Sequence, residues 1–149
     1  MHKISKAIIE CFESKKAVLI CGNGGSMTQA DHMAEELLGK FEKDRVGLPA
    51  ISLSNPSTLS AIANDYDYRQ VFARQVEAYK DIAELLITIS TSGTSSNIVE
   101  AQGRALLNDI EVIPLPTNKE LGTPTYRTQE THLKLIHRIC REVENYYLK

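Results

Sequence analysis

Four short apolar runs alternate with helical patterns along the chain, and this alternation constrains the fold more than any other feature. The runs are AVLICG (17–22), PAISLS (49–54), LLITIS (85–90) and EVIPLP (111–116). Turn residues bound each run and polar alternation is slight, as expected of strands covered on both faces. Helical patterns occupy 28–42, about 57–80 with an interruption near NDYDY, 97–108, and about 129–147. The order predicts an α/β fold with a parallel sheet and a site at the carboxyl ends of its strands.

Composition favours one domain over residues 1–149 and excludes several partners. Lysine and arginine are scattered and the net charge is −2, which argues against nucleic acid or an anionic membrane as the main partner. The three cysteines show no paired spacing, so we expect reduced thiols in a cytoplasmic protein. The N-terminal residues 1–16 form an amphipathic helix pattern rather than a signal peptide, and no apolar run approaches membrane length.

The loop GNGGS (22–26) follows the first apolar run and opens the first helical pattern. Its glycines allow backbone N–H groups to approach a ligand closely. Ser26 and Gln29 have capping-box spacing, which predicts that the helix starts there. A dinucleotide fingerprint would need glycine at Met27, and a Walker A loop would need Gly-Lys-Ser/Thr, so we expect no nucleotide cofactor. The loop alone is compatible with an anion site or with a tight strand-to-helix turn.

The loop STSGTSSN (90–97) also lies between a strand and a helix. Asn97 and Glu100 could cap that helix, and capping would require only one of the loop's hydroxyl groups. Six hydroxyls exceed this need: those of Ser90, Thr91, Ser92, Thr94, Ser95 and Ser96. Many neutral donors at a helix N-terminus suit a phosphate, even without a lysine. We therefore expect anion binding here.

A polar stripe runs along the first predicted helix, opposite its apolar face. It comprises Gln29, His32, Glu36 and Lys40, at spacings of three, four and four residues. His32 and Glu36 therefore lie one turn apart. The pair could be two metal ligands, an acid/base pair beside a bound sugar, or part of a solvated face.

The C-terminal helical pattern carries Gln129, His132 and His137. His132 shares a face with Ile136 and other apolar residues, so we expect it to be packed rather than catalytic. His137 lies off that stripe and is the better candidate for chemistry. Gln129 and His137 are about 12 Å apart along a helix axis. They could meet at one small ligand only if Gln129 precedes the helix proper or if different subunits contribute.

Four segments in order resemble the phosphoheptose isomerases of the sugar isomerase (SIS) fold: CGNGGSMTQADHMAEELLGKF, LSAIANDYDYRQVFARQVEA, LLITISTSGTSSNIVEA and TQETHLKLIHRICREVE. The resemblance implies a flavodoxin-like, three-layer α/β/α fold with a parallel sheet of four to five strands and a long C-terminal helix. It implies a homotetramer with sites between subunits. It also implies conversion of sedoheptulose 7-phosphate to D-glycero-D-manno-heptose 7-phosphate, the first step toward the heptose of bacterial surface polysaccharides such as lipopolysaccharide.

The same resemblance assigns roles to individual residues. Glu36 would be the general base and His137 its acid/base partner in an enediol mechanism. Some family members bind zinc, one ion per subunit, through the positions that match His32, Glu36, Gln129 and His137. Substrate contacts would come from Asn23, Gly24, Gly25, Asn64, Asp65, Ser90, Thr91, Ser92, Ser95 and Gln129, with the residues at 90–95 holding the phosphate.

This sequence departs from the family pattern in three places. Family members usually carry a further strand and helix between EAQGRALL and IEVIPLP, so four strands are expected here where five are usual. The helix that usually precedes ISKAIIECFESKK, and that helps to build the tetramer, is missing. Lys40 stands where arginine is common. The shortened sheet and N-terminus leave open a non-catalytic SIS protein that binds a sugar phosphate or the replication initiator. An isomerase of another ketose phosphate is a further alternative, because it would share every motif.

Overall fold

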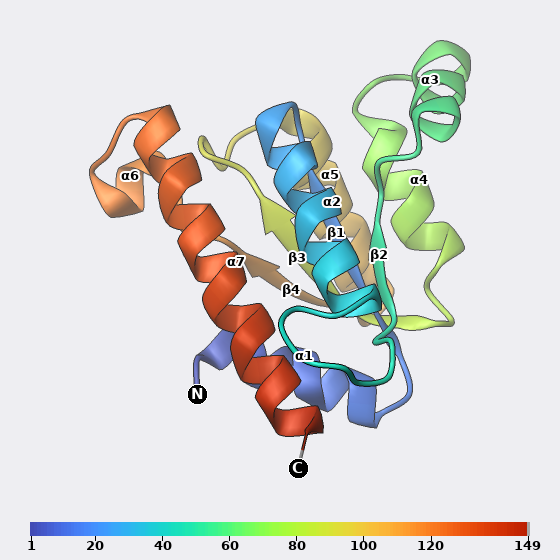
Figure 1. Cartoon of the computed structure of the whole chain (residues 1–149). Helices are drawn as coiled ribbons and strands as arrows, with labels where there is room; N and C mark the ends of the chain where they lie inside the picture. Colours follow the sequence, from blue (N-terminus) through green and yellow to red (C-terminus); the bar gives the residue numbers. More distant parts are fainter. Residues whose placement is uncertain (149) are drawn as a thin grey trace.

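The computed structural model describes residues 1–148 and has three layers, α/β/α (Figure 1). Within those residues the sheet has four parallel strands in the order β2-β1-β3-β4, which confirms the predicted fold class. The strands are β1 (Ala17–Gly22), β2 (Ala50–Ser52), β3 (Ala83–Ile89) and β4 (Glu111–Pro114). The helices are α1 (Lys3–Glu13), α2 (Gly25–Leu38), α3 (Pro56–Asp65), α4 (Gln70–Ala78), α5 (Ser96–Leu107), α6 (Asn118–Leu121) and α7 (Thr125–Tyr147). None of them is long and apolar enough to cross a membrane.

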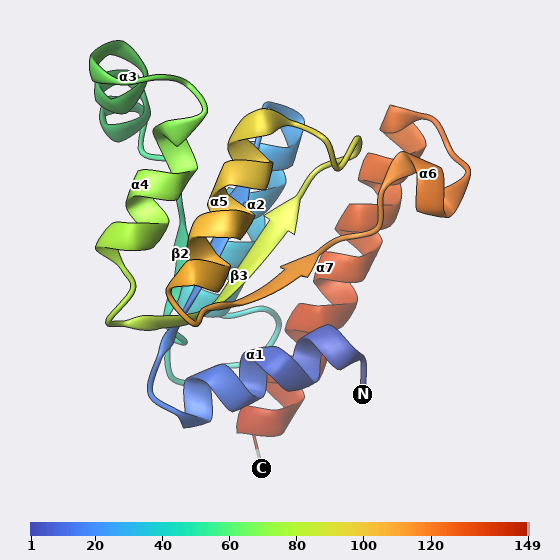
Figure 2. The ribbon, with the colours of Figure 1, turned by 180° about the vertical axis from the view of Figure 1, so that it is seen from behind.

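The central strands are buried on both faces because helices cover each side of the sheet. In β1, Val18 and Ile20 face a core formed with α1, α2 and α7. Leu19 and Cys21 face the opposite core, formed with α4 and α5. Figure 2 shows α4 and α5 on the near side of the sheet and α2 and α7 behind it. The continuous apolar runs in the sequence reflect this two-sided burial.

The bounds of α2 differ from the predicted 28–42, and the predicted capping box is wrong. Gly24 is the N-cap with φ +55°, a value that favours glycine, and no side chain caps this helix. Ser26 is therefore already inside the helix, and the Gln29 amide donates to the Gln129 carbonyl instead. The helix ends at Leu38, so the apolar Phe41 lies in the following loop.

Both candidate loops lie at the carboxyl edge of the sheet, as predicted. The glycine loop connects β1 to α2, and the serine loop connects β3 to α5. From this edge α2 runs back along the sheet, beside α7 (Figure 1). Helix α3 stands away from these two helices and has no buried residue. Side chains on α2 therefore lie progressively further from the loops.

Strand β4 is an edge strand. Within residues 1–148, only β3 pairs with it (Figure 2). Glu111 and Pro114 at its two ends are exposed, whereas Val112 and Ile113 are partly buried. The short helix α6, which periodicity did not predict, follows this strand and leads into α7.

Candidate active site

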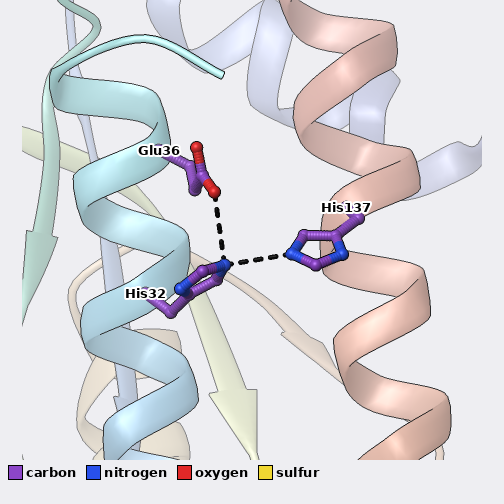
Figure 3. Close-up of side chains that lie close together, drawn as sticks. All are labelled: His32, Glu36 and His137. Carbon is purple, nitrogen blue, oxygen red and sulfur yellow. Dashed lines mark hydrogen bonds and ion pairs between the residues drawn. The ribbon is translucent and has the colours of Figure 1, made fainter. Parts of the chain in front are cut away.

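His32, Glu36 and His137 form a cluster between α2 and α7 (Figure 3). His32 lies in the middle: its Nε2 is 3.2 Å from the Glu36 Oε1 and 3.0 Å from the His137 Nε2. The one-turn spacing on α2 places the first two side chains together, and the packing of α7 against α2 supplies the third. The two residues expected to act as acid and base, Glu36 and His137, are thus linked through His32.

The Glu36 carboxylate is largely shielded from water, with 14% of its side chain exposed. Burial is the main effect that raises its pKa above the ordinary value, and the negative charge of Glu35 adds to it. His32 and His137 act in the opposite direction but only in part. A carboxylate whose pKa is raised toward neutrality is a better general base and acid, because it can both accept and return a proton.

The cluster also fits a metal ion. The three ligand atoms all lie within 4.8 Å of one another. Ligands about 2.0–2.1 Å from a tetrahedral zinc are about 3.3 Å apart, close to the 3.2 and 3.0 Å measured between the side chains. Two imidazoles and a carboxylate are a common donor set for zinc in enzymes. The same three residues can therefore hold zinc or, without it, share protons.

Gln129 does not lie beside this cluster in the single chain. Helix α7 starts at Thr125, so Gln129 lies within the helix, about 12 Å along the axis from His137. Its amide nitrogen is 3.1 Å from the point that a Cβ on Gly25 would occupy. Gln129 therefore does not precede the helix, and it could share a ligand with His137 only if the two residues came from different subunits.

Asn23 in the glycine loop is bonded to Asn97, the second residue of α5. The amides are reciprocal: Asn23 Nδ2 donates to Asn97 Oδ1 at 2.9 Å, and Asn97 Nδ2 donates to Asn23 Oδ1 at 2.8 Å. The Tyr68 hydroxyl also donates to Asn23 Oδ1, at 3.2 Å. Asn97, which was expected to cap α5, makes no such cap. It joins the glycine loop to the helix that follows the serine loop. Its position at the start of a helix suggested capping and gave no indication of this role.

The serine loop presents hydroxyl groups at the carboxyl end of β3. Ser90 Oγ accepts from the Gly93 N–H at 3.0 Å, and Ser92 Oγ accepts from the Thr94 N–H at 3.2 Å. A hydroxyl that accepts in this way keeps its own O–H free to donate. The Asn118 N–H bonds the Thr91 carbonyl at 2.7 Å and holds the loop from the other side. The Ser90 and Ser92 oxygens are 3.5 Å apart and one hydroxyl can donate to the other, so at least one O–H of the pair remains free for an anion.

The two parts of the expected site line separate hollows in one chain. One hollow, of about 410 Å³, lies along α2 and α7 and includes Gly25, His32 and His137. The other, of about 310 Å³, includes Ser90 and Ser92. Glu36 is eleven residues along α2 from Gly25, about 16 Å of helix. A single chain thus separates the His32–Glu36–His137 cluster from the serine hydroxyls.

Asn64 and Asp65, expected to contact sugar hydroxyls, lie at the end of α3. The Asn64 amide donates to Asp65 Oδ1 at 3.1 Å, and both residues are exposed. Helix α3 stands apart from α2 and α7 (Figure 1), so the chain does not itself bring this pair to the histidine cluster.

Comparisons with known proteins identify the family. Residues 1–116 match the model of the SIS domain. A phosphoheptose isomerase of Shewanella denitrificans is 38% identical over 162 residues, covering 97% of this chain and 82% of that protein. Another, of Helicobacter pylori, is 42% identical over 154 residues, covering 94% and 80%. The chain belongs to the phosphoheptose isomerase family. The structure of a phosphoheptose isomerase from Neisseria gonorrhoeae has a TM-score of 0.82 and 33% identity, covering 95% of this chain and 83% of that one.

The alignment with the Shewanella phosphoheptose isomerase is longer than this chain. It extends over 162 positions, whereas the chain has 149 residues. The relative therefore carries residues within the aligned region that this chain lacks. This agrees with the four-stranded sheet and with the direct passage from α5 into β4.

Proposed function

We propose that this chain is an isomerase that converts sedoheptulose 7-phosphate to D-glycero-D-manno-heptose 7-phosphate, the first step toward the heptose of surface polysaccharides. The observation that carries the proposal is the His32–Glu36–His137 cluster, a partly buried carboxylate beside two imidazoles, in a chain of the phosphoheptose isomerase family. A protein that only bound the sugar phosphate would need the serine hydroxyls but not this group of proton carriers.

The roles follow from the chemistry of an aldose–ketose conversion. Glu36 removes the proton from C1 of the ketose, which gives an enediol, and returns it at C2. His137 moves a proton between the two oxygens, a role suited to an imidazole, whose two ring nitrogens can donate and accept. Each proton transfer of this kind typically contributes about 10²–10⁴-fold to the rate. His32, between the two, contacts both groups through the single nitrogen Nε2, which can donate its one N–H to Glu36 or to His137.

Zinc would be held by His32, Glu36 and His137, with Gln129 supplied from another subunit. When bound, the ion would polarise the substrate carbonyl. In that state Glu36 would be less free to carry a proton, so occupancy should affect turnover. We expect zinc to bind wild-type protein with one ion per chain, measurable by titration calorimetry.

The separation of the two hollows supports an assembly in which neighbouring chains complete each site. We propose a cytoplasmic homotetramer in which each 149-residue chain forms one SIS domain. The serine loop, with Ser90, Thr91, Ser92 and Ser95, would bind the phosphate, and Asn23, Gly24 and Gly25 would contact the sugar. Asn64 and Asp65, on the exposed α3, would contact the hydroxyl groups of a sugar phosphate bound at a neighbouring subunit. Multi-angle light scattering tests the mass of the assembly.

The decisive experiment follows sedoheptulose 7-phosphate by ¹³C NMR with wild-type protein and with Glu36→Gln. We expect the wild type to form a new aldose phosphate, and the variant to lose at least about 10²-fold in kcat while it still binds substrate. Glu10→Gln is the matched control, because Glu10 is a helical carboxylate that is 65% exposed and pairs with Lys6 rather than with the cluster. Absence of conversion by folded wild-type protein, with and without zinc, would favour the binding-protein alternative.

A further inference from the structure

A buried ion pair lies at the end of α2, the helix that carries His32 and Glu36. Arg45, in the loop after α2, and Glu144, on α7, each have 2% of the side chain exposed. The Arg45 Nε is 3.6 Å from the Glu144 Oε1, longer than a hydrogen bond. Most of the bonding capacity of both groups is thus directed elsewhere, to the polypeptide backbone around the cluster.

Arg45 holds the end of the helix that carries Glu36. Its Nη2 donates to the carbonyl of Glu36 itself at 2.7 Å, and its Nη1 donates to the carbonyl of Leu37 at 2.8 Å. The same Nη1 is 2.9 Å from the carbonyls of Gly39 and Val46. The last carbonyls of a helix have no partner within it, and a cation there also interacts favourably with the helix dipole. The guanidinium therefore fixes the terminal turn of α2.

Glu144 holds the loop that packs against His137. Its carboxylate accepts the backbone N–H groups of Phe41, Glu42 and Lys43 at 2.9, 3.0 and 3.1 Å. The ring of Phe41 then packs against the imidazole of His137, with centroids 5.8 Å apart. Glu144 follows His137 by seven residues, about two turns, so both side chains leave the same face of α7 toward α2.

We propose that the Arg45–Glu144 pair positions the acid/base cluster: it sets the separation of Glu36 on α2 and His137 on α7 by fixing the terminal turn of one helix and the loop against the other. Neither side chain would contact substrate. The pair is a positioning element, in contrast to exposed ion pairs such as Lys6–Glu10 and Arg127–Glu130, each of which joins two side chains of one helix.

The test uses Arg45→Met, with Arg104→Met as the matched control. Arg104 also bridges two elements, through Glu77 on α4, but lies on the opposite face of the sheet. Imidazole signals in long-range ¹H–¹⁵N NMR report all four histidines. We expect Arg45→Met to shift those of His32 and His137 and to leave His2 and His132 unchanged, whereas partial unfolding would alter all four.

Two further readouts follow the same variants. Zinc affinity, titrated with the metal alone, should fall by about 10–100-fold in Arg45→Met and stay unchanged in Arg104→Met. On the proposed function, kcat should fall by about 10–100-fold with little change in KM. Arg45→Lys should restore only part of each property, because one ammonium cannot reach all the carbonyls that the guanidinium bonds.

A folded Arg45→Met variant with wild-type signals for His32 and His137 would overturn the proposal. It would also be overturned if Arg104→Met lost as much zinc affinity and kcat as Arg45→Met while the two variants showed the same fall in Tm. If Arg45→Met does not fold, Glu144→Gln provides the same test, because it keeps the shape of the side chain and one acceptor oxygen. Wild-type protein without isomerase activity would refute the proposed function alone, since the NMR comparison requires no turnover.

Discussion

Replacing Asn97 by alanine should weaken both candidate loops at once. Asn97 is 2% exposed and exchanges two hydrogen bonds with Asn23, at 2.9 and 2.8 Å. Each such bond contributes about 1 kcal/mol net, so Asn97→Ala should cost about 2 kcal/mol of unfolding free energy. The full penalty for stranded polar groups should not arise, because Asn23 is only partly buried and water can reach its freed amide. In a chain of this size the loss corresponds to a fall of about 4–8 °C in Tm.

The measurement combines thermal unfolding by circular dichroism with turnover of sedoheptulose 7-phosphate. Because Asn97 joins the glycine loop to α5, we expect kcat/KM to fall by about 10-fold or more. Asn108→Ala is the control, since Asn108 is the C-cap of the same helix and its side chain makes one local bond, to the Arg104 carbonyl at 2.8 Å. It should cost about 1 kcal/mol and leave turnover unchanged. An Asn97→Ala variant with the Tm and turnover of the wild type would refute the coupling between the loops.

Two other perturbations test the serine loop and the docking of the N-terminus. Gly93→Ala should lower the free energy of unfolding in urea by about 1–2 kcal/mol, because Gly93 has φ +71° and a Cβ would lie 2.7 Å from the Thr117 Cγ2. Gly103→Ala is the control: Gly103 lies on α5 with open space around it, so this change should raise the free energy of unfolding by about 1 kcal/mol. A Gly93→Ala variant as stable as the wild type would show that the loop relaxes freely. Burial raises the pKa of Glu142, but hydrogen bonds, led by the N–H of His2 at 2.6 Å, lower it to about 2. The ionised carboxylate therefore stabilises the fold fully above about pH 4.5, and this stabilisation is lost as the pH falls toward 2. Glu142→Gln should therefore lower Tm at pH 7 by a few degrees and approach the wild type near pH 2, and a constant difference across that range would contradict the assignment.

The sheet could be predicted from the sequence because burial on both faces leaves a direct signal. Each of the four apolar runs forms a strand, and residues 17–22 match β1 without adjustment. The end of α2 could not be predicted in the same way, since Phe41 continues the apolar period beyond the helix. The helix ends at Leu38 with Gly39 as its C-cap, a local stop signal that the apolar period overrode. Arg45 also bonds the carbonyls of Glu36 and Leu37, and these bonds leave no pattern in the sequence.

The candidate site, too, could be predicted from the sequence only in part. His32 and Glu36 could be paired from their spacing alone, because one turn of helix brings them together. The approach of His137 depends on how α7 packs against α2, which no spacing records. Asn97 stood at a capping position, and only the structure shows its amide turned toward Asn23. The histidine that periodicity predicted to be packed, His132, is indeed fully buried, with its Nε2 2.6 Å from the Pro116 carbonyl.

Within residues 1–148, β4 has one free side, and an exposed strand edge carries a risk of aggregation. A strand with one neighbour offers unpaired N–H and C=O groups to any extended segment that meets it. Here Pro114 ends the strand and Pro116 follows closely, and neither residue has an N–H to donate. Glu111 places a carboxylate at the other end, where a second copy would bring an equal charge. These three residues oppose the addition of a further strand at this edge of the sheet.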